Sequence, residues 1–82
     1  MANTTSKYIS LAELGLQVPG RVVGFTDGDE SLSRLLSMGV VPGALALVLR
    51  RAPLGDPLQV RVEGTLLSIR KQDAHQIQVE PV

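Results

Sequence analysis

The sequence predicts an all-β fold, a small five-stranded antiparallel barrel with short helices. The chain has 82 residues, and 44% of them are hydrophobic, which suits one domain with an aliphatic core. Apolar and polar residues alternate with period two in several short segments, a pattern typical of strands with one buried face. The connections between these segments are too short for the crossovers that parallel strands need. One apolar face per strand must therefore curl around a single core.

The N-terminal quarter is expected to contain a mobile tail, one helical turn and a strand. Residues 1–7 are polar and predict a flexible N-terminus, which leaves residues 8–82 as the folded domain. Ser10 and Glu13 have the spacing of a capping box for a single helical turn. The Pro19-Gly20 pair is typical of a turn. Residues 21–25 then form a short strand in which Gly24 indicates a bulge.

A helix is predicted over residues 29–38, and its candidate N-caps are Thr26, Asp27 and Asp29. Three leucines with i, i+3, i+4 spacing define its apolar face: Leu32, Leu35 and Leu36. Gly39 follows where a helix commonly ends in a left-handed residue. The Pro42-Gly43 pair then predicts a type II turn.

The remaining strands follow closely in the sequence. Residues 44–51 place three leucines on one face and small residues on the other, and residues 57–63 alternate cleanly with Leu58, Val60 and Val62 inward. Gly64 opens a tight connection to a strand that ends at Arg70, and residues 71–75 allow one helical turn. Residues 76–80 form the last strand. About a dozen inward aliphatic side chains fill such a barrel and leave little room for an interior cavity.

Charge and composition exclude several classes of function. Eight basic residues balance eight acidic ones, so the long-range field that attracts nucleic acid or anionic membranes is missing. The chain has no cysteine, and neither a signal peptide nor an apolar run of membrane-spanning length is evident. We therefore expect a cytoplasmic protein that neither inserts into the membrane nor binds nucleic acid. A nucleic-acid binder would instead show salt-sensitive binding.

Residues that could carry chemistry are few. Residues 27–31 begin like a calcium loop, but Leu32 and Met38 stand where glycine and a bidentate acid are needed. His75 has no second histidine or cysteine to complete a metal site. Ser68 and Asp73 have the residue types of a catalytic triad but no pattern that joins them to His75. We expect no catalytic, cofactor-binding or metal-binding residue.

The helix exit is the best candidate for an interaction site. If the three leucines anchor the helix on the barrel, then Met38, Val40 and Val41 remain as apolar residues on an exposed turn. Apolar clusters of this kind often dock partners, and methionine adapts to a partner's surface. Packing within the fold is the alternative explanation for the same run.

The sequence resembles the FeoA family, small proteins of bacterial ferrous iron transport, over residues 8–81. The resemblance is carried by the segments LLSMGVVPGA (35–44), LRRAPLGDP (49–57) and LLSIRKQDAHQIQVE (66–80). It implies an SH3-like five-stranded barrel without enzymatic activity. It also implies an accessory role in which the protein docks on the cytoplasmic GTPase region or membrane-proximal face of the transporter FeoB, which would recruit it to the inner face of the membrane.

The resemblance extends the candidate docking site from the helix to the 53–57 loop. The expected partner-binding residues are Leu32, Leu35, Leu36, Met38, Val40, Val41, Leu54 and Asp56. The same barrel occurs as the C-terminal domain of iron-dependent repressors, so a stand-alone metal- or peptide-sensing domain is the alternative. Weak self-association through an open strand edge also stays open.

Overall fold

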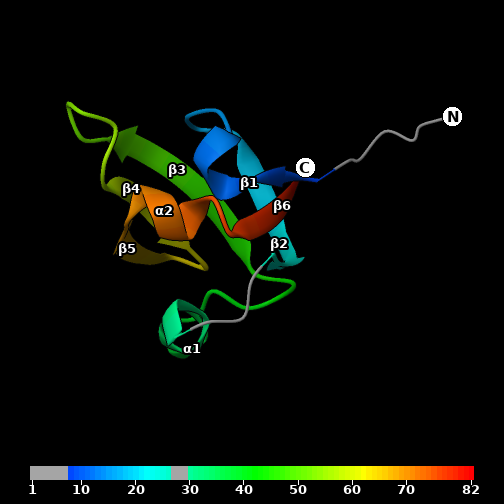
Figure 1. Cartoon of the computed structure of the whole chain (residues 1–82). Coiled ribbons are helices and arrows are strands. Elements are labelled where there is room, and N and C mark those ends of the chain that lie inside the picture. The colour runs from blue at the N-terminus through cyan, green and yellow to red at the C-terminus, as the bar shows by residue number, and fades with distance from the viewer. Residues whose placement is uncertain (1–7, 27–29) are drawn as a thin grey trace, which may run out of the picture.

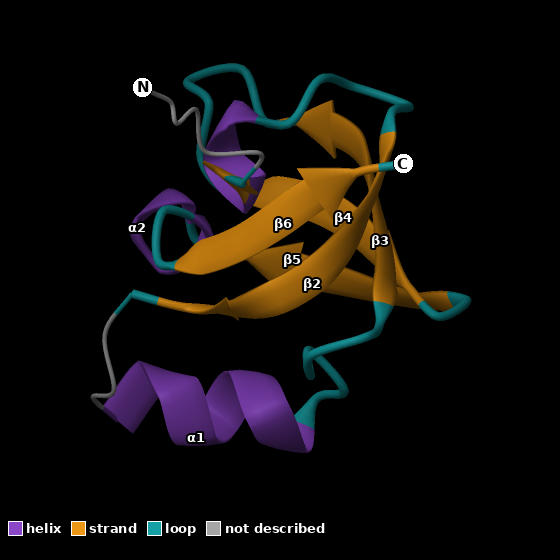
Figure 2. Ribbon diagram, turned by 90° about the vertical axis from the view of Figure 1, so that its right-hand side faces the viewer, coloured by secondary structure: helices purple, strands orange, loops and turns teal. Residues whose placement is uncertain are grey.

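The protein folds as one curled antiparallel sheet with helices at its margins (Figures 1 and 2). This computed structural model describes residues 8–26 and 30–82. The strands are β1 (Ile9–Ser10), β2 (Pro19–Phe25), β3 (Leu45–Arg51), β4 (Leu58–Val62), β5 (Thr65–Ile69) and β6 (Ile77–Pro81). The helices are η1 (Leu11–Glu13), α1 (Glu30–Ser37) and α2 (Lys71–Ala74). The predicted all-β class with short helices is confirmed.

The strand order is β1-β6-β2-β3-β4-β5. Strands β2 to β5 form the predicted meander, but the chain then crosses through α2 so that β6 pairs with β2 and not with β5. Residue Val79 lies opposite Val22 in that pairing. No sequence pattern predicts β1, because two residues are too few to show an alternation. The described part of the chain therefore has six strands, of which five are substantial.

Strand β4 alternates as predicted, with Leu58, Val60 and Val62 buried. Strand β3 turns its small residues inward and its leucines outward. The buried core consists of Leu11, Leu14, Val22, Leu35, Val40, Ala44, Ala46, Val48, Leu58, Val60, Val62, Ile69, Ala74, Ile77 and Val79. Aliphatic side chains thus fill the barrel.

The Pro19-Gly20 pair belongs to β2 and does not form the predicted turn. The chain turns earlier, at Gln17, whose φ is 63°. Gly20 instead permits a close approach, since a Cβ there would lie 2.9 Å from Leu14 Cδ2. The predicted bulge at Gly24 is confirmed, because the register with β6 shifts between Val22 and Gly24.

Helix α1 lies beside the barrel, below β2 in Figure 2. It begins at Glu30 in the described residues and ends at Ser37, one residue before the predicted end. Residues 1–7, predicted to be flexible, lie outside the described residues, as do Asp27 and Asp29 of the calcium-loop comparison. Gly39 adopts the expected left-handed conformation with φ 99°. The Pro42-Gly43 turn also forms, and the Ala44 N–H donates to the Val41 carbonyl at 2.9 Å.

Candidate protein-docking site

The end of α1 forms a Schellman motif, which determines what the helix exit buries. The Val40 N–H donates to the Leu35 carbonyl at 3.0 Å, and the Gly39 N–H donates to the Leu36 carbonyl at 3.1 Å. This motif brings the second residue after the C-cap against the residue five positions earlier. Both Val40 and Leu35 are buried in the core. The expectation that Val40 lies on an exposed turn is wrong, because the motif folds it inward.

The remaining residues of the exit divide by exposure. Leu36 is 40% exposed and Val41 is 39% exposed. Leu32 is partly buried, and Met38 packs against the core from its edge. Among the three predicted anchoring leucines, Leu35 is thus the one that is fully buried. Leu36 and Val41 are the apolar side chains of the exit that a partner can reach most readily.

The β3–β4 loop projects a single leucine into solvent. Leu54 is 93% exposed, the highest value among the exposed large apolar side chains. The loop itself is closed by backbone bonds, since the Gly55 N–H donates to the Ala52 carbonyl at 2.7 Å and the Ala52 N–H donates to the Pro57 carbonyl at 3.0 Å. Leu54 is therefore an exposed apolar side chain on a hydrogen-bonded loop, a geometry suited to insertion into a partner.

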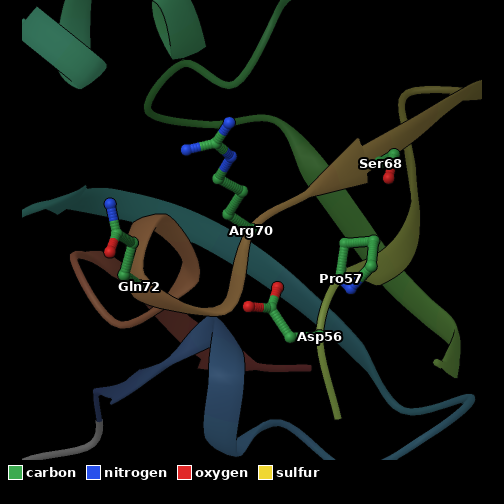
Figure 3. A pocket seen from close by; sticks show the side chains of 5 residues that line it. All are labelled: Asp56, Pro57, Ser68, Arg70 and Gln72. Atoms are coloured by element: carbon green, nitrogen blue, oxygen red, sulfur yellow. The ribbon is translucent and has the colours of Figure 1, made fainter. Parts of the chain in front are cut away.

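Asp56 anchors this loop to α2. Its Oδ1 accepts the Lys71 N–H at 2.9 Å, the first helical N–H of α2. An open hollow of about 490 Å³ lies at the junction, lined by Asp56, Pro57, Ser68, Arg70 and Gln72 (Figure 3). In Figure 3 the Arg70 guanidinium points away from the Asp56 carboxylate. Asp56 thus has a structural role in addition to any contact with a partner.

Among the acidic residues of the described segments, Asp73 is the buried one. It is 3% exposed, and its Oδ2 accepts a hydrogen bond from Arg34 Nη2 at 2.9 Å. This ion pair joins α2 to α1 across 39 residues of sequence. Local patterns cannot reveal such a pair, because its two residues come from separate elements of the chain. His75 is exposed, as predicted.

Two features are absent from residues 8–26 and 30–82. No group of three or more histidine, cysteine or acidic side chains lies close enough to hold a metal ion there. No helix in the same residues is long and apolar enough to cross a membrane.

The fold and site define a small barrel domain with exposed apolar side chains on one loop and one helix exit. A model of the FeoA domain matches residues 9–81 of the chain. The chain therefore belongs to the FeoA family, whose members take part in ferrous iron transport, and its fold is the SH3-like barrel. The family resemblance noted in the sequence is confirmed. This family is one of small accessory domains and is not known for enzymes.

Solved structures and a curated relative support this assignment. The FeoA protein of Chlorobium tepidum is 36% identical, with a TM-score of 0.84 over 90% of this chain and 70% of that one. The FeoA of Stenotrophomonas maltophilia, described as complexed with zinc, is 29% identical, with a TM-score of 0.76 over 87% of this chain and 88% of that one. A FeoA/FeoB fusion protein of Porphyromonas gingivalis is 43% identical over 47 residues, which are 57% of this chain and 6% of that protein.

A similar barrel also occurs in a transcriptional repressor. A manganese-dependent transcriptional repressor is 20% identical, with a TM-score of 0.84 over 95% of this chain and 44% of that one. At this identity the likeness concerns the fold alone.

Proposed function

We propose that this protein is a non-enzymatic accessory factor that docks on the cytoplasmic part of the transporter FeoB and modulates its uptake of ferrous iron. The FeoA/FeoB fusion relative carries the proposal. Fusion places a domain similar to this one in the same polypeptide as the transporter, so the two work at close range in that organism. A separate chain would reach the same arrangement by binding.

The exposed apolar residues of the exit and the loop are the proposed contacts. Leu54 supplies an almost fully accessible side chain, and Leu36 and Val41 add apolar surface at the helix exit. Met38, at the same exit, is partly buried and packs against the core. Burial of a leucine that starts exposed contributes about 1.5–3 kcal/mol. Leu35 and Val40 act indirectly, by fixing the course of the exit from within the core.

Binding to full-length FeoB in lipid nanodiscs tests the proposal. Leu54→Asp should weaken binding at least about tenfold, because a charge replaces the apolar side chain that a partner would bury. The protein itself should stay folded, since Leu54 is 93% exposed. The matched control is Leu16→Asp, because Leu16 is also an exposed leucine, at 48%, and lies between η1 and β2. Equal binding by wild type and Leu54→Asp would contradict the proposed contact, and no binding by any form would contradict the function.

Metal sensing is the second candidate function. The zinc complex of the Stenotrophomonas maltophilia protein favours testing it. Calorimetric titration with Fe(II) or Mn(II), in the absence of any partner, distinguishes the two functions. Saturable heat at micromolar metal would support sensing.

A further inference from the structure

A second apolar surface lies on the outer face of the sheet. The outward leucines of β3 border a groove of about 400 Å³, lined by Pro19, Leu45, Ala46, Leu47, Arg61, Glu63 and Gly64. Leu45 is 38% exposed, and Leu66 on β5 is 59% exposed. None of these residues belongs to the helix exit or to the 52–57 loop. The groove is therefore independent of the proposed FeoB contact.

The strand register places one cation among these apolar side chains. Leu47 on β3 lies opposite Arg61 on β4, and Arg61 in turn lies opposite Leu66 on β5. Side chains directly opposite each other on one face of a sheet are within contact range. A partner that covered Leu47 and Leu66 would therefore also remove Arg61 from water.

The Arg61 guanidinium has neither a hydrogen bond nor an ion pair with any residue of the described segments, where the one ion pair joins Arg34 and Asp73. The acid that lies nearest in sequence, Glu63, forms no ion pair with it. Glu63 also lines the groove, but its Oε2 accepts the Leu45 N–H at 2.7 Å. Covering an unpaired cation with apolar surface is unfavourable unless the partner brings a carboxylate.

We infer that this face binds a segment of a partner protein that presents a carboxylate between aliphatic side chains. The aliphatic side chains contact the outward leucines, and the carboxylate pairs with the Arg61 guanidinium. Nucleic acid fits less well, because its phosphates require several cations and its bases stack on aromatic side chains, whereas this groove has one cation and no aromatic residue.

A second copy of the chain is also a weaker candidate, because most of its described carboxylates are engaged internally. Asp73 pairs with Arg34, Asp56 accepts the Lys71 N–H, and Glu63 accepts the Leu45 N–H. Glu13 likewise accepts the Ser10 N–H. An external segment can supply a carboxylate without breaking any of these contacts.

Nuclear magnetic resonance of the ¹⁵N-labelled protein tests this inference with two blocked peptides, Leu-Ser-Glu-Ser-Leu and Leu-Ser-Gln-Ser-Leu. In an extended peptide the first, third and fifth side chains share one face. We expect the glutamate peptide to shift the amides of Leu45, Leu47, Arg61 and Leu66. We also expect it to bind about fivefold more tightly than the glutamine peptide, the ratio that corresponds to about 1 kcal/mol for an exposed ion pair.

Arg61→Gln should remove the difference in affinity between the two peptides. The control is Arg70→Gln, which changes an exposed arginine of the hollow beside Asp56 and should keep that difference. Equal affinities of the wild type for both peptides would overturn the inference, as would shifts confined to other surfaces or no shifts at about 5 mM peptide. Sedimentation equilibrium of the protein alone tests the second copy. Self-association that Arg61→Gln abolishes and Arg70→Gln retains would also overturn the inference.

Discussion

The Arg34–Asp73 ion pair attaches α1 to α2, and its removal should lower the stability of the protein. Arg34→Gln removes the charge that faces Asp73, a carboxylate that is 3% exposed. A buried carboxylate that loses its partner costs about 3–5 kcal/mol, whereas an exposed pair contributes only about 0–1 kcal/mol. The Arg34 side chain is 56% exposed, so water screens part of the interaction. We expect an intermediate loss of about 1.5 kcal/mol in the free energy of unfolding.

A double-mutant cycle measured by urea denaturation isolates the pair. The single variants Arg34→Gln and Asp73→Asn should each destabilise the protein, and the double variant should lose less than the sum of the two losses, with a coupling of about 1 kcal/mol. The loss of about 1.5 kcal/mol corresponds to a decrease in Tm of about 6–12 °C for a domain of this size. Amide exchange should increase in α1 more than in β4, because the pair holds the helix and not the sheet.

Arg70→Gln is the control for the loss of an arginine. Arg70 is exposed and has no ion pair within the described segments, so its variant should stay within about 0.5 kcal/mol of wild type. Additive losses in the cycle, with a coupling below about 0.3 kcal/mol, would refute the conclusion that this contact holds α1 on the barrel.

Two further predictions concern single residues. Gly39→Ala should destabilise the protein by about 1–2 kcal/mol in urea denaturation, because Gly39 has φ 99° while a Cβ there would meet nothing within 4 Å. The control is Gly24→Ala, since a Cβ at Gly24 would also meet nothing within 4 Å and Gly24 has no positive φ. An equal loss of stability in both variants would contradict the conformational argument. Arg51→Met should lower the free energy of unfolding by about 1.5–3 kcal/mol and increase amide exchange in η1, since Arg51 Nη2 donates to the Ala12 and Leu14 carbonyls at 3.0 Å. Unchanged exchange in η1 would show that these two hydrogen bonds do not hold η1 in place.

The sequence predicts the elements of this fold well where a local pattern defines them. The capping box at Ser10 forms as expected, and the Glu13 carboxylate accepts the Ser10 N–H at 3.3 Å. The alternation of β4 and the left-handed Gly39 are local features of the same kind. Pairing of β6 with β2 is not local, since it joins residues more than 50 positions apart. A prediction from neighbouring residues therefore finds the strands but not the order in which they close the barrel.

The candidate site shows the same limit at the level of side chains. Leu54, a predicted contact residue, is 93% exposed, whereas Val40, predicted at the surface, lies in the core. The signal that places Val40 was present in the sequence, because a glycine C-cap of the Schellman type packs the following residue against the last turn of the helix. The Arg34–Asp73 pair had no such signal, since its partners come from separate elements.

Strand β3 links the core of the barrel to its outer surface. Its alternation of small and large residues is symmetric in the sequence, so period two alone does not decide which face is buried. The structure buries Ala44, Ala46 and Val48 and turns the leucines outward. Bulky side chains from the other elements, such as Leu11, Leu14 and Leu58, already occupy the interior, and a packed core does not accept added volume without strain. The leucines that the core does not accommodate then border the Arg61 groove, so the packing of the barrel itself creates the second surface.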